Sequence, residues 1–257
     1  MLERRFSTHS AAETGGKGRV LVTYPLKAPS RRRERRRDVL AYLTRGSPGK
    51  KTKETGKDSK DAKAAGGSPP FDAVVRLEAT HEKENRFLEG TGCLVPDRVH
   101  GRAYVALSER SDASLAEAWA SQVGYDDVVA FESVDKDGVP VYHTNVLMGV
   151  GTTVAVICAE SIPDLQERQR VLGKLRETHE VVEISFEQMG KFCGNVLEVR
   201  NGDGLPVLAL SSQAYHAFTE KQRDCLRAHL AGLHHAPIDT LERIGGGGVR
   251  CTIAELF

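Results

Sequence analysis

The sequence lacks the features that would place it in a membrane or in an oxidising compartment. Apolar residues make up 40% of its 257 residues, but no uninterrupted apolar run approaches the roughly 18 residues that a membrane-spanning helix needs. Its five cysteines form no C-x-x-C pair, and their odd number argues against a disulfide framework and against a zinc site built from thiolates. We therefore expect a cytoplasmic protein with no membrane partner.

The sequence also lacks a net charge of either sign and the common phosphate-binding motifs. Lys and Arg number 36 against 35 Asp and Glu, a formal net charge of +1, so charge gives no reason to expect a nucleic-acid partner. Neither G-x-x-x-x-G-K-[ST] nor G-x-G-x-x-G after a strand occurs. The glycine cluster at 245–248 is therefore a weak candidate for a nucleotide-binding loop.

Residues 46–70 contain no branched aliphatic and no aromatic side chain. Such a segment cannot bury enough apolar surface to offset a backbone ordering cost of roughly 1–2 kcal/mol per residue. We predict a disordered insertion in one catalytic domain that spans residues 1–257. Upstream, the basic run at 31–38 leads into an apolar segment, which predicts the solvated start of a helix.

The rest of the sequence repeats one order of elements, namely strand, strand, helix, strand. Three complete units cover residues 87–133, 141–186 and 192–244. In the third unit, the strands are expected at 192–200, 205–212 and 236–244, and His234 and His235 between them look like a surface loop pair. Three strands per unit disfavour a helical solenoid.

Two partial units flank the complete ones. Residues 18–26, a helix from Asp38 and residues 71–79 supply the last three elements of an earlier unit, so residues 6–10 are its expected first strand. Residues 244–257 supply only a first strand. Five first strands predict a closed ring whose last unit would be completed by N-terminal residues that this chain does not contain.

Four polar or reactive residues take equivalent places near the starts of the first strands. They are Glu89, His143, Asn195 and Cys251, at intervals of 54, 52 and 56 residues. If each unit begins with an innermost strand, these side chains converge on one axis. Each residue type also has a purely structural interpretation: a rim glutamate, a core histidine, an asparagine turn or a buried cysteine.

The chemistry of these residue types fits covalent catalysis. A thiolate at Cys251 is a nucleophile whose formation depends on a nearby base or positive charge. The imidazole of His143 can protonate a leaving amine and then activate water. The carboxylate of Glu89 can orient that imidazole or hold a cationic group of the substrate, and Asn195 can hydrogen-bond the substrate.

Several motifs resemble the guanidino-group-modifying, or pentein, superfamily. They are FLEGTG, SER before a helix, YHTNV, QM before CGNVLEV, and GGGGVRCTIAE. They occur in the family's order and are most similar to the amidinotransferase-like branch of citrulline hydrolases, related to dimethylarginine dimethylaminohydrolase and arginine deiminase. The resemblance implies an α/β fold, a five-bladed α/β propeller built from ββαβ repeats with its active site on the central axis.

The resemblance also implies roles for single residues. Cys251 matches the family's nucleophile, His143 its general acid and base, and Glu89 the carboxylate partner of the histidine. Arg32 in APSRRRE and Arg110 in SER match the arginines that bind the substrate carboxylate. The implied chemistry needs no metal and no organic cofactor.

Two departures from the family pattern matter. Family members that act on a guanidinium usually have an acidic residue two positions after the histidine, but here that position is Asn145. An amide both donates and accepts hydrogen bonds, so it suits a neutral ureido group better than a cation. Residues 6–10 resemble a strand that normally follows an Asn-Asn-Trp stretch absent here, which indicates a truncated sequence or a lost blade.

We therefore expect a cysteine-dependent hydrolase that cleaves a C–N bond of a citrulline-like or arginine-like amino acid through a covalent thiol adduct. An amidinotransferase with the same nucleophile is one alternative. An inactive or truncated non-enzymatic relative is the other, since an incomplete closing blade would leave an exposed strand edge. The expected partner is the small amino-acid substrate, and a homo-oligomer is left open.

Overall fold

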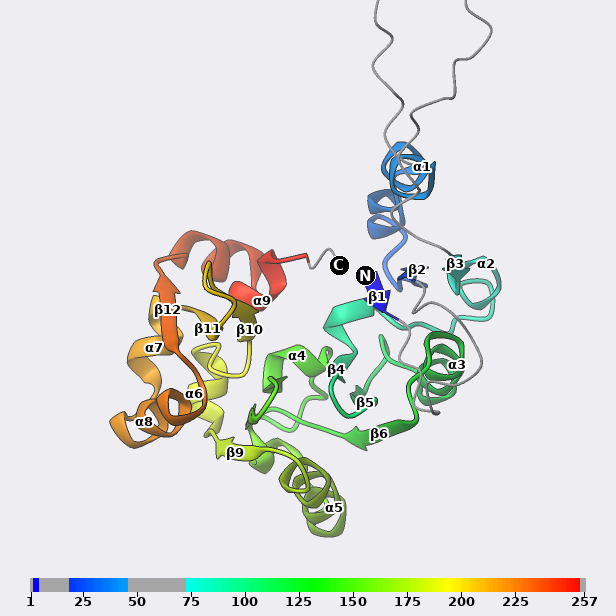
Figure 1. Cartoon of the computed structure of the whole chain (residues 1–257). Helices are drawn as coiled ribbons and strands as arrows, with labels where there is room; N and C mark the ends of the chain where they lie inside the picture. Colours follow the sequence, from blue (N-terminus) through cyan, green and yellow to red (C-terminus); the bar gives the residue numbers. More distant parts are fainter. Residues whose placement is uncertain (1, 5–18, 46–72, 255–257) are drawn as a thin grey trace, which may run out of the picture.

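The structure is a computed structural model that describes residues 2–4, 19–45 and 73–254. Within these residues the strands form four three-stranded sheets, which follow one another along an arc (Figure 1). The fold is thus a mixed α/β fold with several small sheets. The expected strand at 6–10 and the expected insertion at 46–70 lie outside the described residues. None of the described helices is long and apolar enough to cross a membrane.

All four sheets share one topology. The first strand pairs antiparallel with the second, and the third pairs parallel with the second. A parallel pair needs a crossover connection, and a helix supplies it between the second and third strand of every sheet. The predicted order of strand, strand, helix, strand is therefore confirmed in each of the four sheets.

The first two sheets contain the N-terminal half of the described residues. The first sheet and its helices are β1 (Leu2–Arg4), β2 (Arg19–Thr23), η1 (Arg31–Glu34), α1 (Arg37–Arg45), β3 (Ala73–Arg76) and α2 (Glu78–His81). The second unit is η2 (Gly90–Gly92), β4 (Val95–Asp97), β5 (Arg102–Leu107), α3 (Ala113–Val123) and β6 (Asp127–Glu132). Helix α3 begins where Asp112 accepts a hydrogen bond from the backbone N–H of Leu115, and it ends at left-handed Gly124.

The other two sheets contain the C-terminal half. The third unit is α4 (Thr144–Leu147), β7 (Met148–Val150), β8 (Val154–Ile157), η3 (Ala159–Ser161), α5 (Leu165–Arg176) and β9 (Glu180–Glu183). The fourth is α6 (Phe186–Gly190), β10 (Leu197–Arg200), β11 (Pro206–Ser211), α7 (Ser212–Ala217), α8 (Glu220–His229) and β12 (Gly232–Ala236), followed by the π-helix η4 (Leu241–Gly245) and by α9 (Val249–Thr252).

The core lies between the sheets and their crossover helices. The central strand β8 is buried at every position, which fits its continuous apolar sequence, because a parallel strand covered on both faces need not alternate. One apolar cluster joins the second, third and fourth sheets, and another joins the first and second. The crossover helices lie outside the arc, whereas the short helices α4 and α9 face its middle (Figure 1).

The structure corrects the expectation that the candidate residues lie within first strands. Glu89, His143 and Cys251 lie instead at short helical turns, before β4, before β7 and in α9. In each turn a backbone N–H donates to the carbonyl oxygen three residues earlier, a pattern that an extended strand cannot form. The donors and acceptors are Gly92 and Glu89, Val146 and His143, and Cys251 and Gly248.

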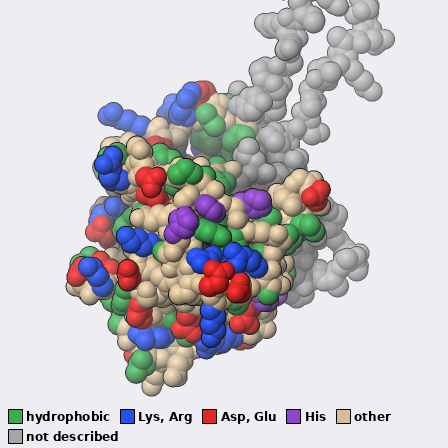
Figure 2. All heavy atoms as spheres, turned by 90° about the vertical axis from the view of Figure 1, so that its left-hand side faces the viewer, with side chains coloured by type: hydrophobic (Ala, Val, Ile, Leu, Met, Phe, Trp, Pro, Cys, Tyr) green, Lys and Arg blue, Asp and Glu red, His purple; other side chains and the backbone are tan. Residues whose placement is uncertain are grey.

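The last strand of the fourth sheet also differs from the prediction. The strand expected at 236–244 lies earlier, at Gly232–Ala236, and pairs parallel with Val207–Ser211. Pro237 has no N–H to continue the ladder, and the apolar residues beyond it have a helical spacing. His234 and His235 are on the surface as predicted, but in β12 rather than in a loop. Figure 2 shows histidine side chains gathered on this face.

Candidate active site

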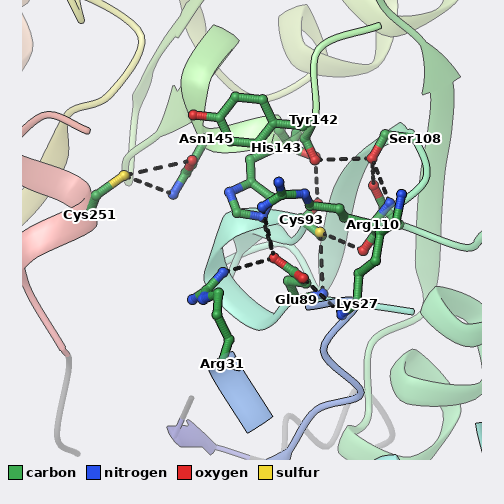
Figure 3. Close-up of polar contacts among 12 residues, drawn as sticks. Lys27, Arg31, Glu89, Cys93, Ser108, Arg110, Tyr142, His143, Asn145 and Cys251 are labelled. Atoms are coloured by element: carbon green, nitrogen blue, oxygen red, sulfur yellow. Dashed lines mark hydrogen bonds and ion pairs between the residues drawn. The ribbon is translucent and has the colours of Figure 1, made fainter. Parts of the chain in front are cut away.

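Glu89 is a buried carboxylate that collects hydrogen bonds from three segments. Its side chain is only 1% exposed. Oε1 accepts from the backbone N–H of Lys27 at 3.0 Å, and Oε2 accepts from Nη1 of Arg31 at 3.0 Å. Nε2 of His143 lies 2.9 Å from the same Oε2 (Figure 3). The carboxylate is thereby fixed from both sides, and one of its contacts is the predicted imidazole.

The electrostatics of the site keep Glu89 ionised. Burial by itself raises the pKa of a carboxyl group. Here the hydrogen bonds from His143 and from the backbone of Lys27, with the charge of Arg31, outweigh burial and lower the pKa of Glu89 to about 2. An anion held in this way can fix the orientation of the imidazole ring beside it.

The backbone holds His143 in position. It is the residue before α4, with an extended backbone, and its side chain is 14% exposed. Its ring packs on Gly92, where an added Cβ would lie 2.8 Å from ring atoms, so only glycine leaves room for it. The ring of Tyr142 lies 4.8 Å from the ring of His143, centroid to centroid.

Cys251 lies in α9, and two asparagines face its thiol. Nδ2 of Asn195 is 3.2 Å from Sγ, and Nδ2 of Asn145 is 3.7 Å from it. Asn195 also accepts from the backbone N–H of Cys251 at 3.3 Å and donates to the backbone oxygen of Asn145 at 2.7 Å. An added Cβ at Gly247 would lie 2.8 Å from Cβ of Cys251, so the glycine cluster allows a close approach at the thiol.

The four residues that recur at intervals of 52 to 56 residues come together in two adjoining groups. Glu89 contacts His143, and Asn195 contacts Cys251, while Asn145, two residues after His143, reaches the thiol (Figure 3). In the described part of the chain, no hydrogen bond joins Cys251 directly to His143. The segment from His143 to Asn145 is the link between the two groups.

The other cysteines lie in environments that disfavour a thiolate. Burial raises the pKa of Cys93, Cys158 and Cys193 to about 12 in each case. It also raises the pKa of Cys225. Cys251 is the exposed cysteine. A thiolate is the reactive form of cysteine, so these four cysteines are disfavoured as nucleophiles.

The structure puts the two predicted arginines in different surroundings. Nη1 of Arg110 lies 3.5 Å from Oε2 of Glu89, and its guanidinium lies 5.0 Å above the ring of Tyr142. Nε of Arg32 instead donates to the backbone oxygen of Leu26 at 3.0 Å, pointing back into its own loop.

Sequence reasoning missed Arg31, whose neighbour Arg32 was chosen from the motif. Arg31 reaches Glu89, and it also pairs with Glu34 within the short helix η1. The only sequence signal was the basic run itself, because a run of arginines does not tell which one turns inward. Lys27 was missed as well; its backbone N–H contacts Glu89, and its side chain pairs with Glu109.

A cavity of about 610 Å³ opens beside both groups. Glu89 and Thr91 line it from one side and Cys251 from another, while β2 and α1 give it an apolar wall. Its size is that of a small-molecule site.

Comparisons with known proteins identify the family and the fold. The family model described as N,N dimethylarginine dimethylhydrolase, eukaryotic, matches residues 6–257. No curated protein matches the chain.

Several solved structures are similar to this chain with TM-scores above 0.5. The apo structure of ArgZ, an arginine dihydrolase from the ornithine–ammonia cycle in Cyanobacteria, is 14% identical over 69% of this chain and 25% of its own, with a TM-score of 0.53. The product-bound N-terminal domain of ArgZ is 16% identical over 72% of this chain and 60% of its own, with a TM-score of 0.54. The complex of AgrE with ornithine and NAD+ is 14% identical over 72% of this chain and 24% of its own, with a TM-score of 0.55.

These identities support the fold alone, and the match spans less than two thirds of each of these chains. The family model, by contrast, covers nearly the whole sequence, including the segments that carry Glu89, His143 and Cys251. The chain therefore belongs to the eukaryotic N,N-dimethylarginine dimethylhydrolase family, within the pentein superfamily.

Proposed function

We propose that the chain is a cysteine-dependent hydrolase that cleaves a C–N bond of a guanidino or ureido amino acid. The observation that carries the proposal is the contact of His143 with Glu89 at 2.9 Å, in the segment whose Asn145 reaches the Cys251 thiol. The family and the fold of the cyanobacterial arginine dihydrolase support the same class of chemistry.

The proposed reaction has two half-reactions, and its bonds and protons balance. The thiolate of Cys251 attacks the central carbon of the substrate, and a C–S bond forms. The C–N bond then breaks while His143 gives its proton to the departing nitrogen. His143 next takes a proton from water, the hydroxide attacks the adduct, and the C–S bond breaks to release the product. These steps use only water and side chains of the chain.

The other residues position the reacting groups. Glu89 stays anionic and holds His143 in one orientation. The amide N–H groups of Asn195 and Asn145 face Sγ and stabilise a thiolate by hydrogen bonding. Substrate entry between the two groups would bring the central carbon within reach of both Cys251 and His143, which makes the substrate itself the bridge.

The proposed substrate has a neutral ureido group, as citrulline has. Asn145 occupies the position from which an acidic residue would pair with a guanidinium, and an amide there can donate and accept. The amide at Asn145 therefore favours a ureido group over a guanidinium.

The substrate carboxylate would bind to arginines of the same region. Arg110 has a buried Nε without a hydrogen-bond partner, a donor that a carboxylate could satisfy. The motif assigns the second arginine to Arg32, whereas the contact with Glu89 favours Arg31. The four sheets would be blades of a five-bladed propeller in one catalytic domain, with this site on its axis.

The proposal is tested by incubating the protein with citrulline, arginine and methylated arginines, with and without an added amine such as glycine. We expect release of a nitrogen product without added amine and, by mass spectrometry, an adduct on Cys251. Turnover that depends on the added amine would instead identify an amidinotransferase. An absence of both turnover and adduct would leave a non-enzymatic relative.

A further inference from the structure

A second cluster of potential ligand atoms lies away from Glu89 and Cys251. Asp97 ends β4, His100 lies in the turn between β4 and β5, and His179 lies between α5 and β9. Each residue offers one ligand atom, and these atoms all lie within 4.8 Å of one another. None of the three residues lines the cavity beside Cys251.

Asp97 supplies the buried carboxylate of this cluster. Its side chain is 0% exposed. Oδ1 accepts from the backbone N–H groups of Val99 and His100 at 3.2 and 3.1 Å, which fixes the plane of the carboxylate. In the described part of the chain, its ion pairs are with His100 and His179 alone. A buried charge needs compensation, and a divalent cation would supply it.

The distances suit a small divalent cation between the three residues. Nδ1 of His100 lies 3.0 Å from Oδ2 of Asp97, and Nε2 of His179 lies 3.9 Å from the same oxygen. Zinc binds nitrogen and oxygen ligands at about 2.0–2.2 Å, so neighbouring ligands of a tetrahedral site are about 3.3–3.5 Å apart. The two separations at Oδ2 lie on either side of that value, and all three ligand atoms lie within 4.8 Å of one another.

The hydrogen bonds of His179 are compatible with metal binding. Nε2 lies 3.0 Å from the backbone oxygen of Gly151, and Nδ1 lies 2.8 Å from Oγ1 of Thr178. If Nε2 turns to a metal ion, Nδ1 carries the proton and donates it to Thr178, whose hydroxyl can accept as well as donate. The carbonyl of Gly151 is then a neighbouring oxygen donor for the ion.

We propose that Asp97, His100 and His179 form a binding site for a divalent transition-metal ion of the zinc class. Two imidazoles and one carboxylate favour such an ion over magnesium or calcium, which prefer oxygen ligands. The side chain of His100 is 30% exposed and gives the ion and a coordinating water a route from solvent.

The site would tie two neighbouring sheets together. Asp97 and His100 belong to the sheet of β4, β5 and β6, whereas His179 leads into the sheet of β7, β8 and β9. A metal ion that binds only the folded chain stabilises it by mass action. The proposed role is therefore structural, and it is independent of the chemistry at Cys251.

The test is zinc binding to the full chain in a Cys251→Ser background, which removes the exposed thiol as a competing ligand. After treatment with a chelator, zinc is titrated in competition with a chromogenic indicator, and cobalt is added separately to record its absorption spectrum. We expect one zinc per chain, a cobalt spectrum typical of tetrahedral coordination, and a higher unfolding temperature with zinc.

Variants assign the ligands. His179→Ala and His100→Ala should weaken zinc binding on the order of 100-fold or more, since even loss of an outer-shell partner costs 10–100-fold. The control His234→Ala changes an exposed histidine of β12 and should leave the affinity unchanged. If His179→Ala, a change at a buried residue, fails to fold, the zinc affinity of His100→Ala decides, because His100 lies in an exposed turn. An absence of zinc binding in the background, or an unchanged affinity in His100→Ala, would overturn the proposal.

Discussion

Oε2 of Glu89 and Nε2 of His143 lie 2.9 Å apart, although 54 residues separate them in the sequence. The two residues come from different sheets, one from the turn before β4 and the other from the turn before β7. Because the two units share one topology, equivalent positions of neighbouring units come into contact. The repeat thus places an imidazole and a carboxylate in contact.

The low pKa of Glu89 predicts a pH-dependent stability. A carboxyl with a folded-state pKa of about 2 and an ordinary value of 4.5 stabilises the fold fully above about pH 4.5, and this contribution is lost as pH falls through 2. Glu89→Gln should therefore cost up to about 3 kcal/mol of unfolding free energy at pH 7. Urea unfolding of both proteins between pH 2 and 7 measures the difference, which should shrink below pH 4.5.

Glu84→Gln is the control for this prediction, because Glu84 is an exposed glutamate that pairs with His81. Its unfolding free energy should follow that of the parent protein at every pH. A difference between the parent and Glu89→Gln that stays constant from pH 7 to pH 2 would contradict the depressed pKa.

Cysteine environments predict selective alkylation. At pH 8, a thiol with a pKa of about 12, as for Cys93, is ionised to only about one part in 10⁴, and burial also blocks access to it. Iodoacetamide should therefore modify the exposed Cys251 first, as peptide mass mapping over time would measure. Cys225→Ser should leave the rapid phase intact, whereas Cys251→Ser should remove it. Rapid labelling that persists in Cys251→Ser would contradict this assignment.

Asn145 predicts the choice between a neutral and a cationic substrate. Asn145→Asp places a carboxylate where a guanidinium would bind, so the ratio of kcat/KM for an arginine-like substrate to that for a citrulline-like substrate should rise about 10- to 100-fold. Steady-state kinetics on both substrates measure the ratio. Asn201→Asp, in the turn between β10 and β11, is the matched control and should leave the ratio unchanged. A ratio that moves equally in both variants would refute this role.

The arginines expected to bind the substrate carboxylate predict that affinity depends on whether that carboxylate is free. Arg110→Ala should raise KM about 10- to 100-fold for a substrate with a free carboxylate, because a charge-assisted hydrogen bond contributes about 1.5–3 kcal/mol. For a substrate whose carboxyl group is amidated, the same variant should raise KM much less. Comparing Arg31→Ala with Arg32→Ala on the same pair of substrates tells which of them is the second ligand. An equal rise in KM for both substrates in Arg110→Ala would exclude carboxylate binding by Arg110.

Much of the fold was predictable because it is local. Alternating and continuous apolar segments mark β5, β8 and β11, and the amphipathic segments between strands became α3, α5 and α8. What failed was the position of short elements. The strand expected at 236–244 proved to be Gly232–Ala236, since its place depends on pairing with β11 and not on its own weak pattern.

The candidate site divides in the same way. The period identified Glu89, His143, Asn195 and Cys251, and each of them contacts another member of the site. The sequence could not tell whether Arg31 or Arg32 faces Glu89. Adjacent side chains point in different directions, and only the packed loop decides which one turns toward the carboxylate.

The sequence by itself determined the repeating order of strands and helices and the residue types that can carry the chemistry, because both follow from local patterns and from a regular spacing along the chain. Only the tertiary structure decided which side chains meet. The turn of η1 brings Arg31 to Glu89, and the packing of neighbouring sheets brings His179 to Asp97. Such contacts depend on the direction of each side chain after distant segments have packed, which no pattern along the chain specifies.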